Sequence, residues 1–250
     1  MEEIKLDIRR SINNPSFWIS IIITLLVIAL GIGSKMLFPE GATEGLSPYY
    51  HAEILFKALS SDIVLMVVPI LCTLPYTTAF LEEHTSGYIK TYIMKCNKES
   101  YIRGKVIAPA ISGGLCLALG ILIAYFIGYL VYAPLELVDE TAISPFIEVL
   151  KTSMLFFTSG CLWASIGALF ANISLSKYMA YASPFVFFYV LVILAERYFQ
   201  KLYIINPKEW LILQNYWPME EWGAILLMGI LTVIICMIND NVIEKRINNE

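Results

Sequence analysis

Six long runs without a charged side chain recur along the chain, separated by polar connections. Each run is apolar on all sides, which is typical of membrane-spanning helices and not of barrel strands, where apolar and polar residues alternate. A helix rises about 1.5 Å per residue, so each run can cross a hydrocarbon core about 30 Å thick, the shortest with help from flanking residues. The predicted spans cover residues 17–37, 62–81, 106–133, 148–171, 178–195 and 221–239.

The residues before the first run predict a short amphipathic helix. Ile4, Ile8 and Ile12 recur every four residues, charged residues occupy the other faces, and Pro15 ends the pattern. The alternative is a charged, frayed terminus, but the apolar stripe and the stop signal agree. We expect an interfacial helix over residues 1–16 that lies in the plane of the lipid headgroups.

These elements predict an all-α polytopic membrane protein with six transmembrane helices and both termini on one side. The interfacial helix over residues 1–16 would precede a six-helix transmembrane domain, residues 17–239, and a tail, residues 240–250. Composition agrees with this class, because 58% of the residues are hydrophobic, 15% are charged and the mean hydropathy is +0.69. Such values lie outside the range of ordinary soluble proteins.

The charges set the expected orientation. With 17 Lys and Arg against 21 Asp and Glu, the net charge of -4 gives no basic excess for nucleic acid. Eleven of the 17 basic residues lie on the side that carries both termini. By the positive-inside rule that side is cytoplasmic, so we expect a multi-pass protein of the cell membrane, and a bacterial one.

The connection between the second and third spans, residues 82–105, has the most informative pattern. One apolar face at helical spacing is formed by Tyr88, Ile89, Tyr92 and Ile93. This spacing predicts an amphipathic cytoplasmic helix. Its apolar face could pack on a partner protein or lie on the bilayer, and the pattern alone favours neither.

The residues around this helix form a recognisable series. Acidic residues close the second span, a Ser-Gly and a Lys follow, and Tyr-Ile-x-Gly-Lys opens the third span. In this chain the series is Glu82-Glu83, Ser86-Gly87, Lys90, Tyr101-Ile102 and Gly104-Lys105. Together with the predicted topology, which covers most of the chain, it resembles the permease subunits of ATP-binding-cassette (ABC) exporters of the type 2 class, which include antimicrobial-peptide and drug export or immunity systems.

The resemblance implies roles for this connection. In that family the first cytoplasmic connection is a coupling helix that docks in a groove of the ATPase subunit. The implied ATPase-docking residues are Glu82, Glu83, Gly87, Tyr88, Lys90, Tyr92 and Lys95.

The partners follow from the same resemblance. The sequence has no GxxxxGK(S/T) motif, so the chain is not expected to bind ATP or to act as an enzyme. ATP and magnesium are expected in a separate ATPase subunit, and this chain is expected to bind no cofactor. Such exporters usually assemble twelve spans, which implies a second permease, identical or homologous. Unlike some members of the family, the chain has no large extracellular domain.

No catalytic, metal or disulfide site is expected in the chain itself. The five cysteines are odd in number and irregularly spaced, and His51 and His84 fall in loops on opposite sides. The span interiors have no charged residue, which disfavours a proton- or sodium-coupled carrier. The pair Glu82-Glu83 is similar to an intramembrane protease motif, but the required downstream Arg and embedded His are missing.

The segment between the fifth and sixth spans, residues 196–221, is too aromatic for an ordinary outer loop. Asn206 as an N-cap, followed by a proline, predicts a short helix through Leu213. In the resembled family such helices cover the outer mouth of the pathway; the alternative is an aromatic belt that anchors the span ends. The outer-mouth residues would be Pro207, Trp210, Tyr216 and Trp217.

Residue spacing also predicts local packing in the spans. Pro69 and Pro75 should kink the second span, since proline removes a helical hydrogen bond. Glu148 and Lys151, at the outer end of the fourth span, are spaced to pair. Small residues at four-residue spacing, which permit close helix approach, are Gly120, Ala124, Gly128, Gly160, Ala164 and Ala168.

Two functions remain open. The first is the permease subunit of an ABC exporter that moves an amphipathic or hydrophobic substrate, such as a peptide, drug or lipid, out of the cell. The second is a membrane-embedded sensor or scaffold that binds a cytoplasmic partner through residues 82–105. ATP hydrolysis coupled to substrate movement separates them, because a scaffold would show neither.

Overall fold

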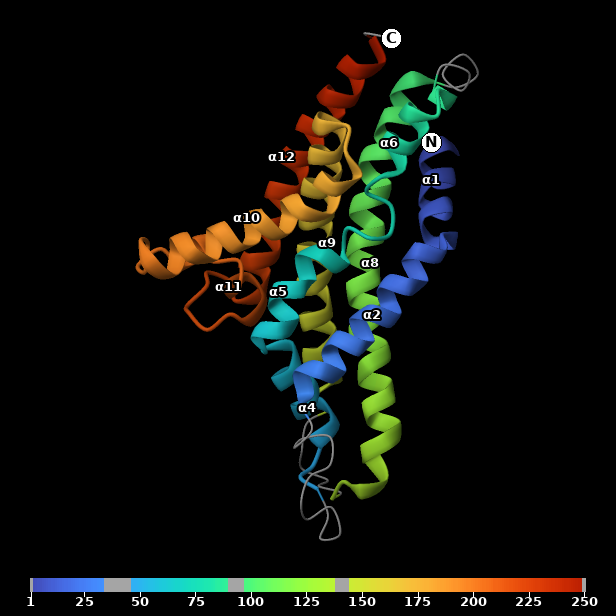
Figure 1. Ribbon diagram of the computed structural model, residues 1–250. Helices are drawn as coiled ribbons and strands as arrows, with labels where there is room; N and C mark the ends of the chain where they lie inside the picture. Colours follow the sequence, from blue (N-terminus) through green and yellow to red (C-terminus); the bar gives the residue numbers. More distant parts are fainter. Residues whose placement is uncertain (1, 34–45, 90–96, 138–143, 249–250) are drawn as a thin grey trace.

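The computed structural model describes residues 2–33, 46–89, 97–137 and 144–248, which are mostly α-helical (Figure 1). Within these ranges the chain forms no β-strand beyond an isolated bridge between Leu46 and Glu136. The predicted all-α fold class is therefore confirmed. The helices are α1 (Glu2–Asn13), α2 (Pro15–Ile32), α4 (Tyr50–Leu59), α5 (Asp62–Leu71), α6 (Ala79–Thr85), α8 (Lys98–Tyr132), α9 (Phe146–Ser174), α10 (Lys177–Arg197), α11 (Glu209–Ile212) and α12 (Glu221–Asn248), with 3₁₀ helices η1 (Ala133–Leu135) and η2 (Tyr203–Ile205).

Five helices are long and apolar enough to cross a membrane, namely α2, α8, α9, α10 and α12. A sixth crossing exists if α4 and α5, which meet at a bend of 69°, form one broken span. The described residues thus form a helical protein with five or six candidate membrane spans. Every predicted span except the second corresponds to one of the five long helices.

The second predicted span, residues 62–81, is not one helix. α5 ends at Leu71, a run of turns follows, and α6 begins at Ala79. Pro75 has no N–H to donate to the carbonyl of Leu71, four residues earlier, so the helix cannot continue in regular form. That carbonyl instead accepts from the N–H of Leu74 at 3.4 Å and, weakly, from the Sγ of Cys116 at 3.9 Å. The expected kink is therefore a full break, and the sequence did not predict α4, which precedes it.

α9 is the central helix of the bundle. It packs against α8, α10 and α12, and 67% of its most apolar stretch is buried, against 33% or less for the other four spanning helices. α8 and α9 approach each other so closely that a Cβ on Gly160 of α9 would lie only 2.6 Å from the carbonyl oxygen of Gly113 on α8. Ala164 and Ala168 are also buried on α9. Small residues thus allow the tight α8–α9 contact.

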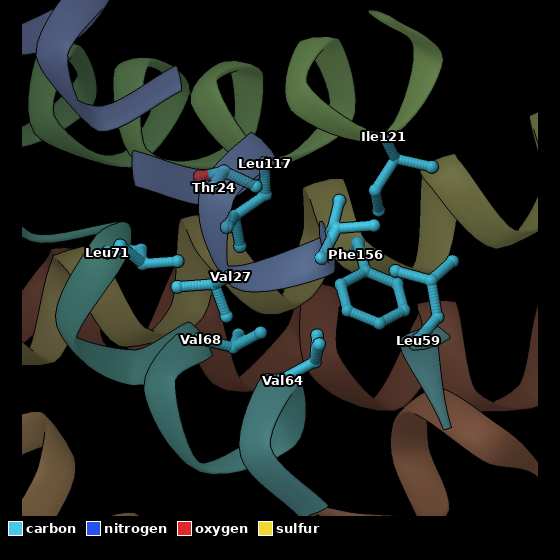
Figure 2. A pocket seen from close by; sticks show the side chains of 10 residues that line it. Thr24, Val27, Leu59, Val64, Val68, Leu71, Leu117, Ile121 and Phe156 are labelled. Carbon is cyan, nitrogen blue, oxygen red and sulfur yellow. The ribbon is translucent and has the colours of Figure 1, made fainter. Parts of the chain in front are cut away.

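The main apolar core lies where α2, α5, α8 and α9 meet. Figure 2 shows side chains from these helices, including Val27, Val68 and Phe156, turned toward one another. The space left between them is about 10 Å³, which holds at most a single water, so this is packed core and no ligand site. Gly120 brings α8 against α2, since a Cβ there would lie 2.7 Å from Cγ2 of Thr24.

Both chain ends lie at one end of the bundle, beside α6 and the start of α8 (Figure 1). We call this the terminal end, defined by α1, α6, residues 98–105 of α8 and the last turns of α12. The opposite end, called the far end, carries α4 and the last turns of α8. α8 is 35 residues long, so at about 1.5 Å per residue its charged first turns extend beyond a bilayer core of about 30 Å.

Candidate functional site

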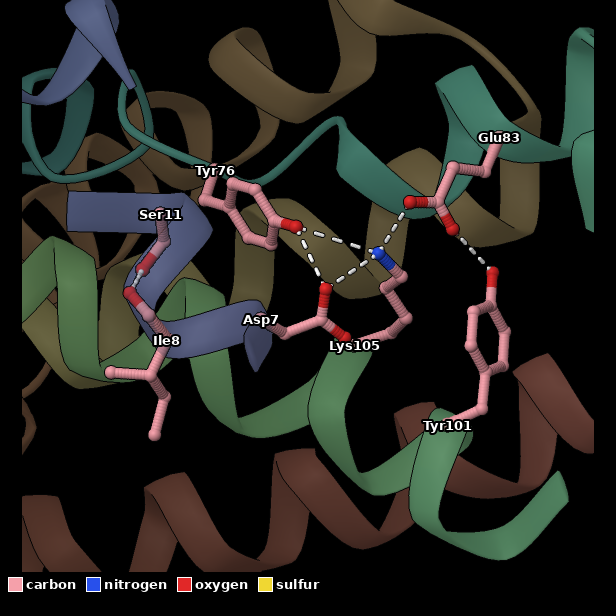
Figure 3. Close-up of polar contacts among 7 residues, drawn as sticks. All are labelled: Asp7, Ile8, Ser11, Tyr76, Glu83, Tyr101 and Lys105. Atoms are coloured by element: carbon pink, nitrogen blue, oxygen red, sulfur yellow. Dashed lines mark hydrogen bonds and ion pairs between the residues drawn. The ribbon is translucent and has the colours of Figure 1, made fainter. Parts of the chain in front are cut away.

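Lys105 is the centre of a buried ion cluster at the terminal end (Figure 3). Its Nζ lies 3.0 Å from Oδ1 of Asp7 and 2.7 Å from Oε1 of Glu83, and the residue is 2% exposed. Tyr76 donates a hydrogen bond to the same oxygen of Asp7 at 2.9 Å. Tyr101 donates to Oε2 of Glu83 at 2.7 Å. These five residues are called the Lys105 cluster.

The Lys105 cluster joins elements that are far apart in the sequence. Asp7 is on α1, Tyr76 is in the turns after α5, and Glu83 is on α6, whereas Tyr101 and Lys105 lie one turn apart on α8. The Lys105 ammonium also lies 5.5 and 5.4 Å from the ring centres of the two tyrosines, within the range of cation–π attraction. One ammonium group therefore binds α1 and α6 to α8.

Two local features of the backbone make room for this cluster. A Cβ on Gly104 would lie 2.6 Å from Oδ2 of Asp7, so the absence of a side chain lets the carboxylate reach Lys105. The turns after α5 place Tyr76 next to α1 and are tied to the junction between α1 and α2, because Nδ2 of Asn14 donates to the carbonyl of Pro75 at 3.2 Å. The break in the second span is thus what brings Tyr76 to the ions.

Burial determines how strongly the cluster holds these elements together. Taking charges out of water is costly, and mutual attraction offsets the cost only while every partner stays in place. Removal of one partner from a buried pair costs about 3–5 kcal/mol. The two carboxylates that share the single Lys105 ammonium also accept from the tyrosine hydroxyls, which satisfies further lone pairs. The cluster therefore favours one arrangement of α1, α6 and α8.

A layer of apolar side chains lies beside the Lys105 cluster and packs the last turns of α12 against the other elements of the terminal end. Ile89, just after Gly87 in the 82–105 connection, is 1% exposed, and Ile243 near the end of α12 is fully buried. The start of the connection therefore packs into the bundle. The buried members of this layer are Phe80, Ile89, Tyr101, Ile102, Val106 and Ile243.

The structure separates the two acidic residues that were predicted to dock an ATPase. Glu82 is exposed and pairs with Lys177, at the start of α10, at 2.8 Å. Glu83 instead turns inward to Lys105, with 19% of its side chain exposed. Glu83 therefore positions α6 on α8 and offers little of its charge to a partner.

The other predicted docking residues lie further along the connection. Gly87 has a φ of +72°, in the left-handed region that glycine adopts without strain, and Tyr88 beside it is 44% exposed. Lys90, Tyr92 and Lys95, and with them most of the expected coupling helix, lie outside the described residues.

Sequence reasoning missed the inward role of Asp7. α1 is a helix, as expected, although it ends at Asn13, three residues before the predicted end. Its polar positions do not all face outward, because Asp7 is 3% and Ser11 0% exposed against α8. With Ile4 and Ile8, these residues have the spacing i, i+3, i+4, i+7 that marks one helical face. That spacing was the available signal for a buried carboxylate.

The segment between α10 and α12 contains a shorter helix than predicted. α11 covers four residues, Glu209–Ile212, and Leu213 follows in the left-handed region with a φ of 53°. Asn206 caps the turn that leads into α11, because its Oδ1 accepts a hydrogen bond from the N–H of Lys208 at 3.1 Å. The result is a single helical turn seated on α9.

Most of the predicted outer-mouth residues pack against the bundle. Trp210 stacks on Trp163 of α9, with ring centres 6.3 Å apart and planes 19° apart, and its Nε1 donates to a backbone carbonyl. Pro207 and Trp217 are also buried, whereas Tyr216 is 82% exposed. The segment is therefore anchored through its tryptophans and presents Tyr216 outward.

Ion pairs attach this segment and the start of α12 to the rest of the chain. Lys208 lies 3.0 Å from Asp62 and 3.3 Å from Glu196. Burial alone would lower the pKa of the Lys208 ammonium, but the hydrogen bond to Asp62 and the charges of Glu196 and Asp62 raise it above its usual value. Lys151 pairs with Glu221 of α12 at 3.4 Å, so the predicted pairing of Lys151 within α9 is wrong, because α12 packs beside it.

No protein-family model matches the chain, and no curated protein matches it. In the part of the chain that the structure describes, no three His, Cys, Asp or Glu side chains are close enough to hold a metal ion. The function of the chain must therefore be inferred from its residues and their geometry.

Proposed function

We propose that the chain is the transmembrane permease subunit of an ABC exporter of the type 2 class, in keeping with its resemblance to that family. A separate ATPase subunit, which holds ATP and magnesium, supplies the energy, and the exported substrate is amphipathic or hydrophobic. The Lys105 cluster is the observation that best supports this proposal, because it fixes both ends of the 82–105 connection to the bundle.

The contacts of the connection suit the transmission of force. Glu83 stands at its beginning and Lys105 at its end, and the two side chains bind each other at 2.7 Å. A displacement imposed on the connection by a docked ATPase therefore reaches the first turns of α8. α8 is one uninterrupted helix of 35 residues, so it carries the displacement toward the far end of the bundle.

An exposed surface around the connection is available for the ATPase. It includes Tyr88, the Glu82–Lys177 pair and the pair formed by Arg103 and Glu99, whose side chains are 64% and 79% exposed. Charged rim residues of this kind steer a partner and set its register more than they add affinity. In this proposal the surface receives the ATPase.

A second permease completes the exporter, either another copy or a homologous chain. α12 has only 11% of its most apolar stretch buried within the chain, and α10 has 33%. These faces contact lipid or the second permease, and substrate moves along the interface between the two subunits. The assembly resides in the cell membrane of a bacterium, with the terminal end in the cytoplasm, as the distribution of basic residues predicts.

Co-purification tests the proposal. The tagged chain is co-expressed with the genes adjacent to its own and purified in mild detergent, and it should retain a subunit with nucleotide-binding motifs. Tyr88→Arg should reduce the retained ATPase at least tenfold, whereas the matched change Tyr216→Arg, in the outer segment, should leave it unaltered. If the wild-type chain never retains an ATP-binding subunit, the proposal is wrong.

A membrane-embedded sensor or scaffold is the second candidate. The Lys105 cluster supports this function as well, because a connection held rigidly on the bundle could also bind a partner that hydrolyses no ATP. Reconstituted vesicles that contain the chain and its co-purified partner separate the two functions. Substrate-stimulated ATP hydrolysis supports the exporter, and its absence with a bound non-ATPase partner supports the scaffold.

A further inference from the structure

An open groove of about 580 Å³ lies where α1 ends and α2 begins. Figure 1 shows these two helices meeting at an angle, and both pack against α8. The groove is lined by two guanidinium groups, two amides, one aliphatic side chain and one phenol ring, which belong to Arg9, Arg10, Asn13, Asn14, Leu6 and Tyr76. The described residues that line it thus supply two positive charges and no carboxylate.

Arg9 is the cation in this groove that the rest of the chain leaves available. It is exposed, and its side chain has no ion-pair or hydrogen-bond partner within the described residues. The carboxylate of Asp7 on the same helix does not neutralise it, because Asp7 is buried and pairs with Lys105 at 3.0 Å. Asn13, one turn further along α1, is also exposed. A guanidinium and an amide side by side can bind the oxygens of a phosphate group.

The start of α2 places the groove at the depth of the lipid headgroups. α2 has 18 residues and no charged side chain, so at about 1.5 Å per residue its whole length is needed to cross a core about 30 Å thick. The residues that precede Pro15 therefore lie in the headgroup layer. Trp18, in the first turn of α2, is 55% exposed, which suits the boundary between the apolar and polar layers. The phosphate groups nearest to Arg9 are thus those of lipids.

One wall of the groove is held in place by the Lys105 cluster. Tyr76 lines the groove, is 9% exposed and donates to Asp7 at 2.9 Å. Asn14 also lines it, and its Nδ2 donates to the carbonyl of Pro75 at 3.2 Å. A headgroup bound here contacts α1 and covers Tyr76 only while these elements are packed together. Binding should therefore raise the midpoint of thermal unfolding, as any ligand of the folded state does.

We propose that this groove binds the headgroup of an anionic phospholipid, such as phosphatidylglycerol, from the leaflet that surrounds the terminal end. The lipid phosphate accepts hydrogen bonds from the guanidinium of Arg9 and the amide of Asn13, and Arg10 adds a second positive charge. Phosphatidylcholine carries the same phosphate, but the two arginines repel its choline cation, so net charge provides the selectivity. Binding at this groove requires neither an ATPase nor transport.

Lipid titration of the purified full-length chain in mild detergent tests the proposal. Native mass spectrometry measures the affinity for the first bound lipid, and thermal unfolding is followed on the same samples. The wild-type chain should bind phosphatidylglycerol at least fivefold more tightly than phosphatidylcholine, and only phosphatidylglycerol should raise the unfolding midpoint. Inorganic phosphate at the same concentration should not displace the lipid. Equal binding of the two lipids, or displacement by inorganic phosphate, would overturn the proposal.

Two double variants with the same loss of charge provide a matched pair. Arg9→Gln combined with Arg10→Gln should weaken the binding of phosphatidylglycerol at least tenfold, because each basic residue near a membrane surface contributes a factor of about five. Arg197→Gln combined with Lys201→Gln, two exposed positions at and just after the end of α10, should keep binding within twofold of wild type. Equal losses in the two double variants would mean that anionic lipid is attracted to basic residues in general and has no site at this groove.

Lysine at the same two positions separates the effect of charge from an effect on folding. Arg9→Lys combined with Arg10→Lys keeps both charges and should bind phosphatidylglycerol within threefold of wild type. If this variant binds as weakly as the glutamine variant, charge does not hold the lipid and the proposal is wrong. The other occupant to test is an acidic surface of a partner subunit. A glutamine variant that binds phosphatidylglycerol like wild type but no longer retains a co-purified subunit would assign the groove to that subunit instead.

Discussion

Lys105 holds the terminal end of the molecule together, because it is the one cation of the Lys105 cluster and pairs with both carboxylates, Asp7 and Glu83. Lys105→Met keeps the approximate length of the side chain and removes its charge, which leaves the buried Asp7 and the partly buried Glu83 without their shared cation. We expect a loss of stability of about 3–5 kcal/mol, seen as a lower midpoint of thermal unfolding in detergent. Lys177→Met, which breaks the exposed pair with Glu82, is the control and should change the midpoint little. Equal shifts would show that the Lys105 cluster is not a structural centre.

Gly104 gives a second prediction at the residue scale. Alanine is normally the better helix residue by about 1 kcal/mol, yet Gly104→Ala should destabilise the protein because its Cβ would lie 2.6 Å from Oδ2 of Asp7. Gly229→Ala on α12 meets no atom within 4 Å and should be neutral or stabilising. The midpoint of thermal unfolding should therefore fall for Gly104→Ala and stay the same or rise for Gly229→Ala, although the chemical change is the same. A stabilising Gly104→Ala would mean that Asp7 does not reach Lys105.

At the scale of helices, the anchoring of α11 leads to a third prediction. Trp210 carries the contact of this single turn with Trp163 of α9, so Trp210→Ala should cost about 3–5 kcal/mol, as large aromatic truncations in cores do. Tyr216→Ala, at a position that is 82% exposed, is the matched control. Limited proteolysis between α10 and α12 should accelerate only in the first variant. If both are cleaved at the wild-type rate, Trp210 does not hold the segment.

The sequence predicted the helices that coincide with long apolar runs. It did not predict the helices whose position depends on contacts with distant parts of the chain. The runs that became α9 and α10 are apolar over their whole length, so membrane burial determines them without reference to neighbours. The second predicted span contains Pro75, which was expected to kink it; the sequence did not show that the chain would fold back there and place Tyr76 beside α1, which is a tertiary effect. α4 carries Glu53 and Lys57, which made it look like an outer loop.

The candidate site shows the same division. Tyr101 and Lys105 are adjacent to the third span and were visible as a motif, and Glu83 was singled out for its charge. Asp7 and Tyr76 join them only because α1 packs on α8 and the turns after α5 fold back. Contacts between residues that are 69 or 98 positions apart have no short-range signal.

On the scale of the whole molecule, two ends of different character are joined by α8. The terminal end is held by buried ions, whereas the far end is held by His51, Glu136 and the backbone contacts of Leu46. The ion cluster makes the first turns of α8 part of a rigid unit with α1 and α6. The last turns of α8 are less tightly packed within the chain, because Phe126, Leu130 and Val131 are all more than half exposed. A single helix therefore connects the proposed ATPase surface with the far end.

The orientation of these two ends gives the last prediction. In the predicted topology, eleven of the 17 basic residues fall on the side that carries the termini, so the terminal end should face the cytoplasm. In a background in which the five native cysteines are replaced by alanine, Glu53→Cys at the far end should react with a membrane-impermeant maleimide on intact cells. Glu99→Cys, at the start of α8, should react only after the membrane is permeabilised. Both side chains are exposed, at 49% and 79%, so a difference in reactivity reports the side of the membrane and not burial. The reverse labelling pattern would place the 82–105 connection outside the cell, where no ATPase could dock on it.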